Sequence, residues 1–130
     1  MKKALIIALI AVSAVSFVSC KHNSAEAPQI DPNTQTVSVL KEKVLSDGTR
    51  ELSVKPNGVC STQIDLTVKD GIILDAKITD GCPGNTAGVC ELIKGMTAEE
   101  AIARLKGIDC AGKGTSCPDQ LALALEYLQK

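Results

Sequence analysis

The chain has 130 residues, six cysteines, one Tyr, one Phe and no Trp, and its formal net charge is −1. A slightly acidic chain is a poor candidate for nucleic-acid binding, and so few aromatic side chains cannot form a platform for base stacking. A chain of this length forms one small domain with a modest aliphatic core, which cross-links or a bound metal would help to stabilise.

The first twenty residues have the features of an export signal. Lys2 and Lys3 precede an uncharged run over residues 4–18, and a small residue comes directly before Cys20. This order resembles a bacterial lipoprotein signal, in which cleavage leaves the cysteine as the lipidated N-terminus. We therefore expect residues 1–20 to be a lipoprotein signal peptide, Cys20 to be the lipidation site, and the protein to be a membrane-anchored lipoprotein of the cell envelope. A plain secretory signal and a short transmembrane anchor are the alternative interpretations.

The next segment has the composition of a linker. Residues 21–35 contain Pro28, Pro32 and few apolar side chains, which predicts a flexible tether between the lipid anchor and a folded domain of residues 36–130. The only histidine, His22, lies in this tether and is therefore a weak candidate for a catalytic base.

Two hairpins follow the tether. Polar and apolar residues alternate from Thr36, break at residues 46–49 and resume at 51–54, which predicts the first hairpin. The second hairpin turns at Asp70-Gly71 and should bury one apolar face under helices. The apolar residues expected on that face are Ile64, Leu66 and Val68 before the turn and Ile72, Leu74, Ala76 and Ile78 after it.

Three helical stretches complete the chain. The first begins at residues 82–83 and ends near 95, and the second is opened by a capping box at residues 97–100. The last helix begins at Ser116 or Cys117. The sequence therefore predicts an α+β fold of order β-β-β-β-α-α-α, with a small antiparallel sheet of three or four strands and three helices packed on one face.

The six cysteines have different expected roles. Cys20 belongs to the anchor. Cys90 follows Cys82 by eight residues in one helix, a rise of about 12 Å, so the two cannot share a disulfide or a small metal site while that helix is intact. Apolar neighbours make Cys90 a candidate core thiol. The remaining four are Cys60, Cys82, Cys110 and Cys117.

Chemistry alone leaves three uses of these four thiols open. One is a tetrahedral thiolate site for Zn²⁺ or an iron–sulfur cluster, and the helix start at Cys117 favours the thiolate form that such a site needs. Another is a pair of structural disulfides, of which Cys60 with Cys82 and Cys110 with Cys117 is the first pairing to consider. The third is a redox-active dithiol. The spacing does not decide between them, because the chain has no CxxC pair.

Few other residues are candidates for chemistry. Asp109, Asp119 and Thr62 lie beside or near cysteines and could support the ligands or supply a fourth one, although capping of the last helix is the favoured role for Asp119. No pair of carboxylates stands out as acid and base, so we predict no catalytic residue.

The residues around the four thiols resemble the TSCPD domain family, which is named after the motif at residues 115–119. The similarity extends from about residue 52 to 125, and the four cysteines of the family fall on the four thiols selected above. The other matching motifs are Pro56-Asn57-Gly58-Val59-Cys60-Ser61, Gly81-Cys82-Pro83-Gly84-Asn85, Gly95-Met96 with Ala98-Glu99-Glu100, and Leu105-Lys106-Gly107-Ile108-Asp109-Cys110.

This family resemblance implies a second function class. TSCPD units occur as small stand-alone proteins and as the C-terminal appendage of cobalamin-dependent (class II) ribonucleotide reductases. The resemblance therefore also implies an accessory or thiol-relay domain related to ribonucleoside-diphosphate reductase, with Cys110 and Cys117 as the relay pair. The chain is too short to hold a reductase's radical and nucleotide site, so we expect no nucleotide turnover by this protein alone.

The sequence is also distantly similar to the U-type iron–sulfur cluster scaffolds, whose three cysteines correspond to Cys60, Cys82 and Cys117. Two positions differ, because Thr62 stands where the scaffolds have Asp and Ser116 stands where they have His. Cys110 would be an additional ligand. The resemblance therefore implies a tightly held, non-catalytic four-thiolate site rather than a labile transfer scaffold.

Overall fold

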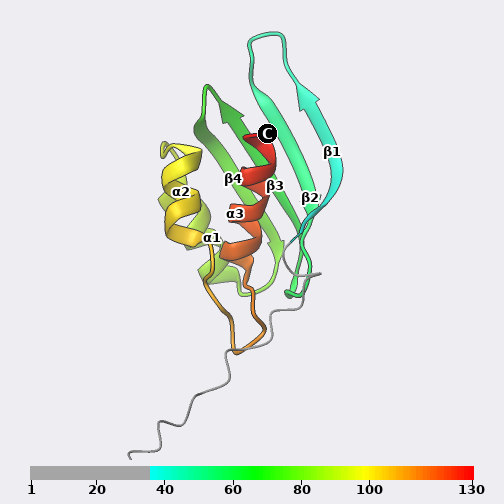
Figure 1. The fold of residues 1–130 in the computed structure, drawn as a ribbon, viewed down its shortest axis with the longest axis vertical. Helices are drawn as coiled ribbons and strands as arrows, with labels where there is room; N and C mark the ends of the chain where they lie inside the picture. Colours follow the sequence, from blue (N-terminus) through cyan, green and yellow to red (C-terminus); the bar gives the residue numbers. More distant parts are fainter. Residues whose placement is uncertain (1–35) are drawn as a thin grey trace, which may run out of the picture.

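The computed structural model describes residues 36–130, which form one four-stranded antiparallel sheet and three helices (Figure 1). The sheet order is β1-β2-β3-β4, so neighbouring strands in the sequence are neighbours in space. The predicted α+β fold is confirmed. The predicted signal peptide, Cys20 and the tether lie outside the described residues. The elements are β1 (Ser38–Val44), β2 (Arg50–Lys55), β3 (Ser61–Lys69), β4 (Ile72–Asp80), α1 (Pro83–Ile93), α2 (Ala98–Leu105) and α3 (Cys117–Leu128).

The hydrophobic core lies between the sheet and the helices. α3 packs on β2 and β3, α1 packs on β4, and α2 packs against α3 (Figure 1). α3 is the central helix, because every residue from Cys117 to Leu125 is buried. None of the helices within residues 36–130 has the length and apolar character that a membrane crossing requires. The residues of β2, β3 and α3 that are almost completely buried include Leu52, Val54, Ile64, Leu121 and Leu125.

The predicted alternation in β4 is wrong at its first half. Leu74, expected in the core, is 49% exposed, whereas Ile73 is completely buried. The cause is a register shift, since Val68 pairs with Ile73 and Thr67 pairs with Asp75, which leaves Leu74 as an extra residue in β4. An extra residue in one strand reverses the faces of the side chains on one side of it. The second half of the strand, with Ala76 and Ile78 buried, follows the prediction.

The turn between β3 and β4 has a left-handed backbone at both Asp70 and Gly71. Gly71 has φ +77°, and a Cβ at this position would meet no atom within 4 Å. Replacing Gly71 with Ala should therefore lower the free energy of unfolding by about 1–2 kcal/mol, because an L-residue is strained in the left-handed region. Gly88 in α1 also has open space around it but lies in a helix, so Gly88→Ala should raise the free energy of unfolding by about 0.5–1 kcal/mol.

Urea unfolding followed by circular dichroism measures both changes. Because both substitutions add the same methyl group to an exposed glycine, each serves as the control for the other. An unchanged or higher free energy of unfolding for Gly71→Ala would contradict the assignment of a left-handed turn at Gly71.

Candidate functional site

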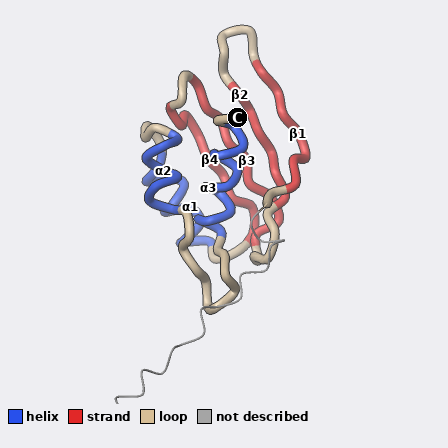
Figure 2. The backbone as a smooth tube through the Cα atoms, viewed as in Figure 1, coloured by secondary structure: helices blue, strands red, loops and turns tan. Residues whose placement is uncertain are grey.

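The candidate cysteines lie at one end of the molecule, opposite the β3–β4 turn. The β2–β3 connection, the β4–α1 connection and the long α2–α3 loop all reach this end (Figure 2). Cys60 lies in the first connection, Cys82 in the second and Cys110 in the third, while Cys117 begins α3. Three connections that are distant in the sequence therefore meet at the same end of the sheet.

Gly81 lies at the point where two of the thiols converge. A Cβ built on Gly81 would be 3.6 Å from the Sγ of Cys60 and 3.7 Å from the Sγ of Cys117. The backbone reaches this point through two left-handed residues, Asp80 with φ 64° and Gly81 with φ 85°. Glycine tolerates this conformation, and the Thr86 methyl lies 3.4 Å from the same Cβ position. The structure thus brings together one thiol from the start of β3 and one from the start of α3.

Three of the four candidate thiols, those of Cys60, Cys82 and Cys110, are exposed, and only Cys117 is buried. Cys82 is the N-cap residue of α1, is exposed, and makes no capping hydrogen bond with its side chain. Cys110 is exposed in the α2–α3 loop. Cys60, Cys82, Cys90, Cys110 and Cys117 are all free thiols. Within residues 36–130, no group of three or more His, Cys, Asp or Glu side chains is arranged to hold a metal ion.

The α2–α3 loop is organised by Asp109, which sequence reasoning left as a supporting group or a ligand. Its carboxylate oxygens accept hydrogen bonds from the backbone N–H groups of Gly112 and Gly114, both at 2.6 Å. The Cys110 N–H donates to the Thr115 carbonyl at 3.0 Å and closes the loop. Asp109 therefore fixes the loop that carries Cys110, and its two oxygens are engaged in doing so.

Asp119 does not have the simple capping role that was favoured for it. The N-cap of α3 is Ser116, whose hydroxyl accepts a hydrogen bond from the Asp119 N–H at 3.1 Å. The Asp119 carboxylate is buried and accepts hydrogen bonds from the Gly107 N–H at 2.7 Å and from the Thr115 hydroxyl at 2.6 Å. Asp119 therefore joins the end of α2 to the start of α3.

Gln120 was missed by the sequence analysis. Its side chain is completely buried; its Oε1 accepts a hydrogen bond from the Asn57 N–H at 2.9 Å, and its Nε2 donates to the Thr115 hydroxyl at 3.0 Å. These bonds connect the β2–β3 loop, which carries Cys60, to the segment just before Cys117. The feature of the sequence that could have identified Gln120 is its position as an uncharged polar residue among the apolar residues of the last helix.

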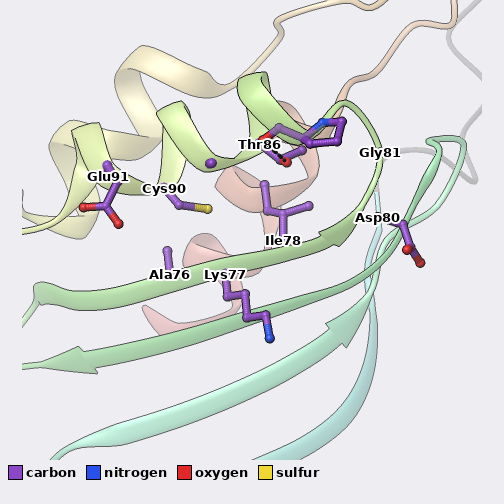
Figure 3. A pocket seen from close by; sticks show the side chains of 10 residues that line it. Ala76, Lys77, Ile78, Asp80, Gly81, Thr86, Cys90 and Glu91 are labelled. Atoms are coloured by element: carbon purple, nitrogen blue, oxygen red, sulfur yellow. Dashed lines mark hydrogen bonds between the residues drawn. The ribbon is translucent and has the colours of Figure 1, made fainter.

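The prediction that Cys90 is a core thiol is confirmed, because it is 5% exposed and belongs to the main hydrophobic cluster. Burial raises the pKa of the Cys90 thiol, although a backbone hydrogen bond to Ile78 opposes this effect. The side chain lies between α1 and β4 beside Ile78, at a cavity of about 500 Å³ (Figure 3). The same cavity is lined by Asp80 and Gly81, and Cys90 lies eight residues after Cys82, about 12 Å further along α1.

Comparisons with known proteins give one family assignment. The model of the TSCPD domain matches residues 33–129, which include all four candidate thiols and most of the chain. No curated protein matches the sequence. The match covers the whole sheet and all three helices, and the chain therefore belongs to the TSCPD domain family.

Proposed function

We propose that this domain is a non-catalytic metal-binding module in which Cys60, Cys82, Cys110 and Cys117 hold one Zn²⁺ ion or one iron–sulfur cluster. The observation that carries the proposal is the convergence of the Cys60 and Cys117 sulfurs on Gly81, at the same end of the domain. Four thiolates are the donor set that both kinds of centre require.

The surrounding residues fit this role in part. Cys82 directly follows Gly81, and Cys110 is at the start of the hydrogen-bonded loop that ends at Cys117. Both thiols are exposed and free, and their side chains and loops would have to move toward the sulfurs of Cys60 and Cys117 for all four to bind one metal. Metal bound there would link the start of β3, the start of α1, the α2–α3 loop and the start of α3, and would thereby stabilise the domain.

The proposed setting is the cell envelope, with the domain held at a membrane by a lipid on Cys20. This part of the proposal depends on the N-terminal sequence, in which two lysines, an apolar run and a small residue precede the cysteine. Mature wild-type protein whose intact mass lacks acyl chains on Cys20 would contradict the lipid anchor.

Metal content tests the central proposal. Protein purified without oxygen should carry one metal ion or one cluster per chain, measured by elemental analysis and native mass spectrometry. Cys117→Ser should carry none, whereas Cys90→Ser should carry as much as the wild type, because Cys90 is buried away from the site. Metal-free wild-type protein whose intact mass shows the hydrogen loss of two disulfides would reject the metal and support the disulfide-stapled domain instead.

A further inference from the structure

Cys60 and Cys117 are two free thiols that border the same place in the fold. A Cβ at Gly81 would lie 3.6 Å from the Cys60 Sγ and 3.7 Å from the Cys117 Sγ. Both sulfurs therefore lie within 4 Å of one point, although Cys60 comes just before β3 and Cys117 begins α3.

Buried hydrogen bonds hold together the two segments that carry these thiols. The Gln120 side chain accepts a hydrogen bond from the Asn57 N–H, which lies shortly before Cys60 in the sequence. The same side chain donates to the hydroxyl of Thr115, which lies just before Cys117. Gln120 is completely buried, so water does not compete for these bonds. The two segments are therefore joined through Gln120, independently of the cysteines themselves.

A bond between the two sulfurs requires a local movement. A disulfide is about 2.05 Å long, and a change of χ1 rotamer moves a cysteine sulfur by about 3 Å. Cys60 is exposed in the connection between β2 and β3, so its side chain has room to rotate. Cys117 is only 8% exposed and is fixed in the first turn of α3. Rotation of the Cys60 side chain is therefore the movement that closes the bond.

We propose that Cys60 and Cys117 are a redox pair, which forms a reversible disulfide when a small-molecule disulfide such as oxidised glutathione acts on the metal-free protein. The Cys60 thiolate attacks one sulfur of the oxidant, expels a glutathione thiolate and forms a mixed disulfide. The Cys117 thiolate then attacks the Cys60 sulfur and expels the second glutathione. The two protein thiols lose two protons and two electrons, and one oxidised glutathione becomes two reduced ones.

The exposure of the two thiols sets the order of these steps. A dissolved oxidant reaches the exposed Cys60, whereas the buried Cys117 reacts with the sulfur beside it. The pairing differs from Cys60 with Cys82 and Cys110 with Cys117, the first pairing that the sequence suggests. Because a sulfur in a disulfide is not a thiolate ligand, oxidation would also keep metal from the proposed site, and this consequence alone rests on the proposed metal-binding function.

Disulfide mapping of the full-length protein tests the proposal. The protein is equilibrated in EDTA with a glutathione redox buffer, acid-quenched, and digested without reductant for mass spectrometry. The wild type should give a peptide that links Cys60 to Cys117. Cys82→Ser and Cys110→Ser should keep this peptide, whereas Cys60→Ser should lose it. The exposed position of Cys60 makes Cys60→Ser compatible with folding.

Two further measurements report on the steps and on the fit of the bond. Cys117→Ser should accumulate glutathione on Cys60, because the second step has lost its attacking sulfur, whereas Cys90→Ser should behave as the wild type. The oxidised wild type should unfold at a higher urea concentration than the reduced protein in EDTA, because the bond closes the long chain segment between the start of β3 and the start of α3.

Three results would overturn the redox pair. They are a peptide linking Cys60 to Cys82 or Cys110 to Cys117 in place of the expected one, a glutathione adduct on Cys60 that persists in the wild type, and an oxidised form that unfolds at a lower urea concentration than the reduced form. EDTA makes these results independent of metal. A wild type that binds no metal and still forms the bond between Cys60 and Cys117 would refute the proposed function alone.

Discussion

Replacing Asp119 with Ala is expected to lower the free energy of unfolding of the metal-free protein by about 2–4 kcal/mol. The carboxylate is buried and holds the Gly107 N–H and the Thr115 hydroxyl. Alanine would leave the Gly107 N–H without its partner in a partly buried place, and would remove two hydrogen bonds to a charged acceptor. The measurement is urea unfolding in EDTA, so that metal binding does not contribute.

Two other substitutions make this prediction specific. Asp119→Asn keeps one acceptor oxygen and should fall between the wild type and Asp119→Ala. Asp75→Ala removes an exposed carboxylate that pairs with Lys94 at 3.0 Å, and should change the free energy of unfolding by no more than about 0.5 kcal/mol. An effect of Asp119→Ala as small as that of the control would show that Asp119 does not hold α2 and α3 together.

The contacts of Asp119 and Gln120 also explain how the candidate site is held. Thr115 binds the carboxylate of Asp119 and the amide of Gln120, and Gln120 in turn binds the backbone of the loop before Cys60. The position of Cys117 relative to Cys60 is therefore set by buried polar contacts and not by the apolar core alone. Such a network fixes one arrangement when every member is satisfied.

The elements of this fold could be predicted because their signals are local. The capping box at Thr97 is confirmed by the hydrogen bond from the Glu100 N–H to the Thr97 hydroxyl at 3.1 Å. The Asp70-Gly71 turn and the buried face of Ile64, Leu66 and Val68 also lie where alternation and turn chemistry place them. Each of these features depends on residues a few positions apart.

The features that the sequence did not predict depend on distant partners. The bulge at Leu74 cannot be read from β4 alone, because it is a property of the pairing with β3. Gln120 binds a backbone group 63 residues away, and nothing in the last helix indicates that partner. The meeting of Cys60 and Cys117 was expected only from the family resemblance and from both residues lying at the ends of elements.

Metal binding should make the stability of the domain depend on its cysteines. With free Zn²⁺ at a thousand times its dissociation constant, the free energy of unfolding should rise by about 4 kcal/mol over the value in EDTA. Single Ser variants of Cys60, Cys82, Cys110 and Cys117 should lose most of this gain. Cys90→Ser should keep it, because that thiol lies in the core at α1 and β4. Thermal or urea unfolding in a thiol-free reductant, with and without zinc, measures the gain for each variant.

The variant at Cys110 is the most informative of the four. Because Cys110 is exposed, Cys110→Ser should leave the free energy of unfolding of the metal-free protein within about 0.5 kcal/mol of the wild type. Any loss of the zinc-dependent rise in that free energy then reports on metal ligation alone. Cys117 is buried, and its substitution changes packing and ligation together. If Cys110→Ser keeps the full gain while Cys117→Ser loses it, Cys110 is not a ligand and the site has at most three of the proposed thiolates. If all four variants keep the gain, zinc binds elsewhere, and the convergence of Cys60 and Cys117 on Gly81 serves packing and not metal.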